Sequence, residues 1–321
     1  MANHDIPQPL GNQGQMLANR VKKRFKHLHK RFAKQNIEVF RLYDWDIPEI
    51  RAVVDWYAGH LVIGEYMRRQ SVPEWLPAMG QAVAEALGVP PENVHLKQRR
   101  AGKQDGLRYE RLDHTNRKFV VSERDLKFFV NPHDFVDTGL FGDHRNTRQM
   151  IREVAAGKDF LNLYCYTATF SCYAATGGAR TTLSVDRSQT AIQWSRENLQ
   201  LNRIPEAANR LVQADTLHFL RGAKRRGQAF DLAVVDPPSY STTRIRKSAF
   251  DIARDHPLLL QAVIDVMREG SVIFFSTNHQ GFIMRTDDLK VAAVKEITDL
   301  TIPEDYLSKK KTIHRCWRID L

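Results

Sequence analysis

The chain has 321 residues, of which 42% are hydrophobic, so it is long enough for one large domain or two ordinary ones with a sizeable core. It contains no apolar stretch as long as a membrane span and no secretory signal at its N-terminus, so we expect a cytoplasmic protein without a membrane partner. An excess of 48 Lys and Arg over 37 Asp and Glu gives a net charge of +11, which favours an anionic partner, most often a nucleic acid.

A basic amphipathic helix is predicted near the N-terminus. Residues 16–34 contain eight Lys or Arg residues, two His and no acid. Apolar residues recur every three or four positions and form one stripe, made of Leu17, Val21, Phe25, Leu28 and Phe32. The basic residues on the remaining faces are either simply solvated or contact the phosphate backbone of an RNA. An anionic membrane surface is a third alternative, which nothing else in the chain supports.

Residues 37–136 predict a small α+β domain of strands around one helix, and residues 1–36 form the flexible lead-in and basic helix before it. Strands are expected at 37–43, 52–57, 60–66, 93–99, 109–113, 118–123 and 126–131. The pair Ala58-Gly59 indicates a hairpin, and a helix is expected at 74–88. This region shows no catalytic cluster of its own.

Residues 137–321 alternate strands with helices, which is the pattern of an α/β domain with a parallel sheet. The strands are expected at 158–164, 181–186, 209–215, 230–236, 271–277 and 314–321. Helices lie between most of them, notably at 188–201 and 253–268. The three cysteines of the chain are sparse and scattered, which argues for reduced thiols and against a metal site.

Three acids, Asp186, Asp215 and Asp236, each stand at the carboxyl end of an apolar strand. The carboxyl edge of an open α/β sheet is where ligands bind, and an acid after the second strand typically contacts a ribose hydroxyl. The alternative for Asp186 is that it caps the following helix, with Ser188 as a competitor for that role. The three acids together favour a nucleotide-like ligand at this edge.

The turn after the first of these strands limits the identity of that ligand. It reads "NLYCYTATFSCYAATGG" and lacks the G-x-G-x-x-G sequence that brings backbone amides against a pyrophosphate. The chain also contains no G-x-x-x-x-G-K-[ST] phosphate loop. A ligand with ribose and adenine but no phosphates fits better, and S-adenosylmethionine is such a ligand.

The stretch "FDLAVVDPPSY" (230–240) predicts a buried strand that runs into a stiff corner. Pro237 and Pro238 cannot donate backbone hydrogen bonds, so the strand must end before them. Asp236 is thereby fixed at the edge where ligands bind. The plain alternative is a strand followed by a turn.

Several motifs carry a family resemblance in their combined order. They are "MLANRVKKRFKHLHKRFAK", "RLYDWDIPE", "DTGLFGDHR", "DFLNLYCYTATFSCYAATGGARTTLSVD", "NLQLN", "QADTLHFL", "FDLAVVDPPSYS" and "HRCWRI". From about residue 16 onward, the chain resembles the C-terminal, guanine-N7 methyltransferase half of the bifunctional bacterial 23S rRNA methyltransferases of the RlmKL family. The resemblance implies a Rossmann-like class I methyltransferase that uses S-adenosylmethionine, with the small domain and the basic helix contacting RNA.

The resemblance also assigns roles to individual residues. At the cofactor it places Phe141, Asp143, Arg145, Asn162, Tyr164, Tyr166, Thr167, Asp186, Arg187, Ser188, Asp215 and Thr216. Among them, residues 162–167 would hold the methionine end, Asp186 the ribose and Asp215 the adenine, and Arg145 would pair with the cofactor carboxylate. Asp143 has the alternative role of a helix N-cap. At the target base the resemblance places Asp236, Pro237, Pro238 and Tyr240.

Two departures from the family pattern matter. Thr167-Ala168 stands where the family has Thr-Gly, which leaves less room for close approach of the backbone. The N-terminal half of the bifunctional protein is absent from this sequence, so a separate protein is considered as its replacement. The expected nucleic-acid partner is 23S rRNA or its assembly intermediate.

Guanine N7 carries an exposed lone pair and loses no proton when it is methylated, so the corner needs to place the base rather than deprotonate it. Asp236 is therefore expected to accept a hydrogen bond or to orient the corner, and Tyr240 to stack on a base taken out of the RNA. The alternative for Tyr240 is a packed core aromatic.

Four other activities are alternatives to guanine-N7 methylation. N6-adenine methylation uses a similar acid-Pro-Pro-aromatic corner and stays open. C5-cytosine methylation needs a cysteine nucleophile near the strand ends that read "DPPSYS" and "FFSTNHQ", and none is there. A non-catalytic RNA-binding or ribosome-assembly factor would not need the three acids at the sheet edge, Asp186, Asp215 and Asp236. A small-molecule methyltransferase would not need the basic helix.

Overall fold

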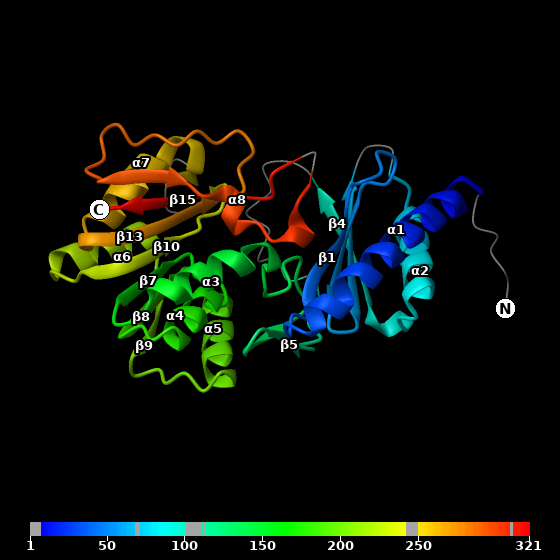
Figure 1. Cartoon of the computed structure of the whole chain (residues 1–321), viewed down its shortest axis with the longest axis horizontal. Coiled ribbons are helices and arrows are strands. Elements are labelled where there is room, and N and C mark those ends of the chain that lie inside the picture. Colours follow the sequence, from blue (N-terminus) through cyan, green and yellow to red (C-terminus); the bar gives the residue numbers. More distant parts are fainter. Residues whose placement is uncertain (1–7, 68–70, 101–110, 112, 242–249, 309–310) are drawn as a thin grey trace. The chain divides into compact units, whose positions relative to one another are not determined.

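A computed structural model describes residues 8–67, 71–100, 111, 113–241, 250–308 and 311–321 (Figure 1). The chain divides into two compact units, each with its own core. The first unit contains Met1–Asp125 and Val130–Thr138, and the second contains Leu126–Phe129 and Gly139–Leu321. No helix among the described residues is long and apolar enough to cross a bilayer.

The first unit is a four-stranded sheet with two helices on one face. Its strands are β1 (Val39–Asp44), β2 (Ala52–Tyr57), β3 (His60–Met67) and β4 (Val94–Arg100), in that spatial order. The helices are α1 (Gln8–Ala33) and α2 (Trp75–Leu87), and a short 3-10 turn, η1 (Pro91–Asn93), precedes β4. Strands β1 to β3 are antiparallel and β4 runs parallel to β3. Ala58 and Gly59 both have positive φ, which confirms the predicted hairpin turn.

Helix α1 is part of this core. The predicted apolar stripe is confirmed, because Leu17, Val21, Leu28 and Phe32 are buried in one cluster with residues of α2 and the sheet. Burying each such side chain stabilises the fold by roughly 1.5–3 kcal/mol. The helix begins at Gln8, earlier than the predicted start, and its Lys22, Lys26 and Lys30 remain exposed.

Most predicted strands of this unit are found with small shifts at their ends. The predicted strand at 109–113 lies partly outside the described residues, and Arg111 within it makes only an isolated bridge to Phe135. Strands β5 (Phe119–Glu123) and β6 (Leu126–Val130) form a separate two-stranded sheet.

The second unit confirms the predicted α/β fold class. Its seven-stranded sheet has the order β14-β15-β13-β10-β7-β8-β9. These strands are β7 (Asp159–Leu163), β8 (Thr181–Asp186), β9 (Asn209–Gln213), β10 (Phe230–Val235), β13 (Met267–Thr277), β14 (Ala293–Glu296) and β15 (Arg315–Asp320). The five strands from β13 to β9 are parallel, whereas β15 and β14 are antiparallel to their neighbours. The strand order reverses between β7 and β10, which is the place where such sheets bind ligands.

Helices cover both faces of this sheet (Figure 1). They are α3 (Arg145–Val154), α4 (Thr169–Thr176), α5 (Gln189–Leu201), α6 (Thr216–Arg225), α7 (Ile252–Ile264) and α8 (Thr298–Thr301). Buried residues of α6 and α7 pack with one set of strand side chains, and buried residues of α3 and α4 pack with the alternate set. Short elements complete the unit, namely η3 (Gly142–His144), η4 (Glu304–Tyr306) and the strand pair β11 (Tyr240–Ser241) and β12 (Phe250–Asp251).

Candidate functional site

The candidate site lies at the carboxyl ends of β7, β8, β10 and β13, which pair in parallel as neighbours. Asp186 ends β8 and is only 5% exposed. Its carboxylate accepts hydrogen bonds from the backbone N–H of Tyr166 at 3.0 Å and of Ser188 at 2.8 Å. Burial raises the pKa of the Asp186 carboxyl above its usual range, against the lowering effect of these two hydrogen bonds. Ser188, and not Asp186, is the N-cap of α5, since its hydroxyl accepts from Ala191 N–H.

The turn after β7 has an unusual backbone. Tyr164, Tyr166 and Ala168 have φ values of 58°, 49° and 56°, so alternate residues adopt the left-handed conformation that side chains disfavour. Such strain persists where the surroundings fix it, and it is concentrated at ligand sites. Alternation of this kind also turns successive N–H groups toward one side of the chain.

Two side-chain hydrogen bonds hold this turn in place. Thr167 donates through Oγ1 to the carbonyl of Gly139 at 2.6 Å, and Asn198 of α5 donates to the carbonyl of Thr167 at 2.9 Å. Asn162 is buried on β7 and donates to Ser171 Oγ at 2.9 Å, so its amide belongs to an internal network beneath the turn.

Of the other residues predicted at the cofactor, some are exposed at the surface and others are buried or cap a helix. Asp215 is exposed and caps α6 by accepting from His218 N–H at 3.0 Å, with Thr216 buried beside it. Arg187 is exposed. Phe141 is 38% exposed, and its ring lies 5.3 Å from that of Tyr166.

Arg145 is buried, and its guanidinium forms an ion pair with the buried Asp305. That pairing already engages the group expected to face the cofactor carboxylate. Asp143 does not cap α3, because it lies within η3 and the helix has no side-chain N-cap hydrogen bond. The N-cap alternative for Asp143 is therefore wrong.

The corner after β10 is held by hydrogen bonds from the neighbouring strand. Ser276 of β13 donates through Oγ to Asp236 Oδ1 at 2.6 Å, and Ser239 donates to Asn278 Oδ1 at 2.5 Å. Pro237 is buried and Pro238 is half-buried. Tyr240 is also half-buried, and its ring lies 6.2 Å from that of His279, so it is not a fully packed core residue.

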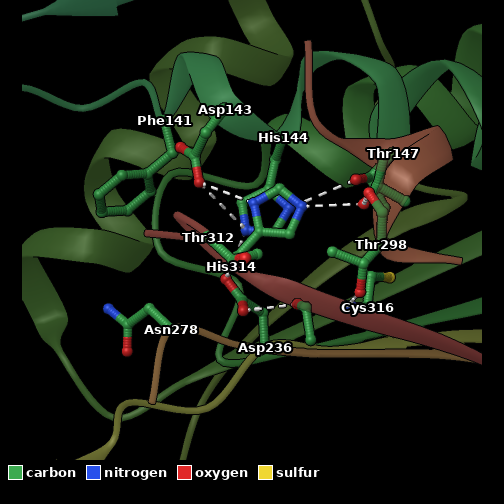
Figure 2. Close-up of polar contacts among 12 residues, drawn as sticks. Phe141, Asp143, His144, Thr147, Asp236, Asn278, Thr298, Thr312, His314 and Cys316 are labelled. Carbon is green, nitrogen blue, oxygen red and sulfur yellow. Dashed lines mark hydrogen bonds and ion pairs between the residues drawn. The ribbon is translucent and has the colours of Figure 1, made fainter. Parts of the chain in front are cut away.

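Two histidines that the sequence did not single out lie beside this corner (Figure 2). His144 Nε2 is 3.6 Å from Asp236 Oδ2 and 3.9 Å from Asp143 Oδ2. The rings of His144 and His314 stack with centroids 4.2 Å apart and planes within 10°. His314 Nδ1 lies 3.0 Å from Asp143 Oδ2. The sequence feature that could have identified them is that "FGDHR" and "HRCWRI", both part of the family resemblance, each contain a histidine.

Asp143, His144 and His314 are also close enough to suggest a metal site. A histidine nitrogen binds a metal through a lone pair in its ring plane, and here the two ring planes are almost parallel with centroids 4.2 Å apart. One ion cannot lie in both planes at once, so the rings as placed fit hydrogen bonding better than metal binding.

Comparison with known proteins gives a consistent assignment. Residues 45–303 match the sequence model of a family described as S-adenosylmethionine-dependent methyltransferase. The chain is 41% identical over 310 residues to the ribosomal RNA large subunit methyltransferase K of Neisseria meningitidis, covering 94% of this chain and 86% of that protein. It is 40% identical to the methyltransferase K/L of Pseudomonas putida over 98% of this chain, but it spans only 43% of that longer protein.

Solved structures share the fold. A putative methyltransferase in complex with S-adenosylhomocysteine (SAH) is similar with a TM-score of 0.76 at 20% identity, covering 97% of this chain and 82% of that one. A methyltransferase from Agrobacterium tumefaciens gives a TM-score of 0.60 at 16% identity, over 84% of this chain and 87% of that one. The strained turn, the acid after β8 and the corner after β10 thus lie on a known methyltransferase scaffold. The chain belongs to the S-adenosylmethionine-dependent methyltransferase family, together with the ribosomal RNA large subunit methyltransferase K that it matches.

Proposed function

We propose that this chain transfers the methyl group of S-adenosylmethionine to N7 of a guanine in 23S rRNA. The observation that carries the proposal is the stiff corner at Asp236, which lies where the strand order reverses, next to the strained turn after β7. The similarity to two ribosomal RNA large subunit methyltransferases supports RNA as the substrate class. An rRNA substrate would place the protein in the cytoplasm.

Asp186 is proposed to bind the ribose of the cofactor. A carboxylate offers about four lone-pair sites, so oxygens that already accept from Tyr166 and Ser188 can also accept from ribose hydroxyls. The left-handed residues of the turn are proposed to aim backbone N–H groups at the methionine end. The exposed Phe141 and the half-buried Tyr166 offer aromatic surface beside the same turn. Asp215 and Thr216 remain proposals for the adenine end.

Methyl transfer to N7 requires the base, the methyl carbon and the sulfur to lie in line, with water excluded. The cofactor supplies an electrophilic methyl group, and N7 attacks through its lone pair without losing a proton. Asp236, fixed by Ser276 and followed by Pro237, is proposed to accept a hydrogen bond from the base edge. Tyr240 is proposed to stack on the extruded base.

A covalent mechanism of the C5-cytosine type has no support in the second unit. All three cysteines are buried and free, and the residues that end β13 are Ser276 and Thr277. Burial raises the pKa of each thiol, to about 12 for Cys172, which disfavours the thiolate nucleophile that this chemistry needs.

The RNA is proposed to contact the exposed basic residues of α1 as well as the corner. A separate partner protein, expected as an alternative from the sequence, has no support in the comparisons. RNA alone is therefore the substrate to test first.

The test is to incubate the purified protein with methyl-labelled S-adenosylmethionine and unmodified 23S rRNA, and then to identify the labelled nucleoside. We expect 7-methylguanosine, and we expect its loss in the Asp236→Ala variant. Label in N6-methyladenosine would keep the fold and the cofactor but overturn the substrate. Failure of the protein to bind the cofactor at all would overturn the proposal entirely.

A further inference from the structure

The buried cluster of Asp143, His144 and His314 has no role in the function proposed so far. It lies directly beside the Asp236 corner, on η3 and near the start of β15 (Figure 2). His144 and His314 are 5% and 2% exposed. Polar atoms of side chains as buried as these two imidazoles need hydrogen-bond partners.

The hydrogen bonds of His314 fix the orientation of its ring. Thr301 Oγ1 donates its single hydrogen to the carbonyl of Thr298 at 2.9 Å. In that arrangement the hydroxyl is an acceptor for the ring at its contact of 3.0 Å with His314 Nε2. The contact of 3.0 Å between His314 Nδ1 and Asp143 Oδ2 then also holds a proton between them. His314 is thus anchored at both nitrogens.

The surroundings of His144 select one of its tautomers. Among the described residues, its Nε2 lies nearest to carboxylate oxygens, 3.6 Å from Asp236 Oδ2 and 3.9 Å from Asp143 Oδ2, which favours the ring hydrogen on Nε2. Its Nδ1 lies 3.4 Å from the hydroxyl of Thr147, from which it can accept. Burial lowers the pKa of His144, and the nearby His314 and Arg148 act in the same direction against the two acids, which is consistent with a neutral ring.

We propose that His144 is a positioning residue for methyl transfer, whose Nε2–H orients Asp236 Oδ2 while Ser276 holds Oδ1. His314, anchored by Asp143 and Thr301, keeps the His144 ring in place by stacking. A polar group thus lies beside each oxygen of Asp236, with the Ser276 hydroxyl 2.6 Å from Oδ1 and His144 Nε2 3.6 Å from Oδ2. The inference rests on the proposed function of Asp236 and adds how its orientation is set.

The kinetic test compares His144→Leu with His144→Gln, because the glutamine amide retains an N–H near Asp236 and the leucine does not. For His144→Leu we expect kcat to fall about tenfold, at the weak end of the range for contacts with a charged group, because the N···O distance of 3.6 Å is longer than a hydrogen bond. SAH affinity should stay within about twofold, because the described polar contacts of His144 are with Asp143, Thr147 and Asp236. His144→Gln should recover most of the lost rate. Equal losses in both variants, or a loss of SAH affinity that accounts for the rate, would overturn the proposal.

His256→Gln is the matched control, because His256 is also buried in the second unit, where its ring packs against Phe282 and its nitrogens contact backbone groups of Ile252 and Arg285. We expect it to lower the stability of the protein and to leave kcat per folded molecule unchanged. If it lowered kcat as much as His144→Leu does, a general effect of buried histidines would replace the positioning role.

A spectroscopic test does not depend on the RNA substrate. In protein labelled with ¹⁵N at histidine, nuclear magnetic resonance should show His144 as the neutral ring with hydrogen on Nε2. Asp236→Asn should move that nitrogen signal and leave the signals of His256 in place. The opposite tautomer, or no response to Asp236→Asn, would overturn the inference. If the wild type shows this tautomer but methylates no RNA, the proposed function fails while the contact between His144 and Asp236 stands.

Discussion

At the scale of single residues, Asp186 is the side chain on which cofactor binding depends most in this account. Its carboxylate is buried at the end of β8 and already joins the turn after β7 to the start of α5 through two backbone N–H groups. One acid thus joins the turn to α5, and it is the residue proposed to bind the ribose. The sequence correctly predicted that Asp186 lies at the carboxyl edge of the sheet, because an acid stands where the apolar strand ends.

Cofactor affinity should depend on pH through Asp186. Burial raises the pKa of this carboxyl, so it takes up a proton at a higher pH than an exposed aspartate does. Ribose hydroxyls donate to the carboxylate form, which is populated above that pKa. SAH affinity, measured by calorimetry, should therefore be constant near neutral pH and fall as the pH drops through the raised pKa.

Asp186→Asn supplies the comparison for this pH effect. It should lower SAH affinity about 10- to 100-fold at neutral pH, as expected for hydrogen bonds to a charged group, and remove the dependence on acid. An acid-dependent loss of affinity that persists unchanged in Asp186→Asn would assign the effect to another group.

Ala168 tests the departure from the family pattern in the turn. Its left-handed φ of 56° costs roughly 1–2 kcal/mol for a residue with a side chain. Glycine would remove that strain but would lose a buried methyl group worth about 0.8 kcal/mol and gain freedom in the unfolded chain worth about 0.4–1 kcal/mol. These effects nearly cancel, so urea unfolding of Ala168→Gly should match the wild type within about 0.5 kcal/mol.

Ala168→Val keeps an apolar side chain at the same position but adds branching at Cβ, which the left-handed conformation does not accommodate. We expect it to destabilise the protein by at least about 2 kcal/mol and to weaken SAH binding. A valine variant as stable as the glycine variant would show that the turn does not hold its backbone in this conformation.

At the scale of elements, the segment before η3 packs against α5 through Gly139. Its φ is +108°, and a Cβ there would lie 2.2 Å from the Trp194 ring. The indole is fixed because its N–H donates to the carbonyl of Phe129 at 3.0 Å. Gly139 also accepts from Thr167, so its position is coupled to the turn after β7.

Gly139→Ala should therefore destabilise the protein by about 3 kcal/mol or more, because conformational strain and overpacking combine. Gly157→Ala is the control, since Gly157 has a φ of +71° but open space where a Cβ would lie. It should cost only about 1–2 kcal/mol in urea unfolding. Equal losses in the two variants would show that Trp194 moves aside.

Some helices and strands could be predicted from the sequence and others could not. The parallel strands and most helices were predictable, because apolar runs and strand–helix alternation are local signals. Strand β14 was not, since its Ala293–Glu296 sequence is mostly exposed and has no apolar pattern. The pairing of His144 with His314 was also hidden, because the two residues are far apart in sequence and only the sheet brings them together.

At the scale of the whole molecule, the charge of +11 is concentrated in part on α1, whose apolar stripe packs into the first unit. The exposed Lys22 and Lys26 on this helix are expected to contact RNA phosphates. Lys22→Gln/Lys26→Gln should lower the slope of log affinity for RNA against log salt concentration by about 1.4, at about 0.7 per phosphate of a single strand.

Lys290→Gln/Lys295→Gln removes the same charge from exposed positions in the second unit and is the matched control. Its salt slope should stay near that of the wild type. An equal reduction in both double variants would mean that RNA binding follows net charge and has no particular site on α1.

The central claim is that the Asp236 corner places a guanine for methylation at N7 and does not remove a proton from it. The most direct measurement is single-turnover methyl transfer to 23S rRNA by Asp236→Asn and Asp236→Ala, with the product nucleoside identified. An asparagine can accept a hydrogen bond but cannot act as a base, so it should lose only about tenfold in rate and still give 7-methylguanosine, while alanine should lose about a hundredfold or more. An asparagine variant as inactive as the alanine variant, or a product other than 7-methylguanosine, would contradict the account.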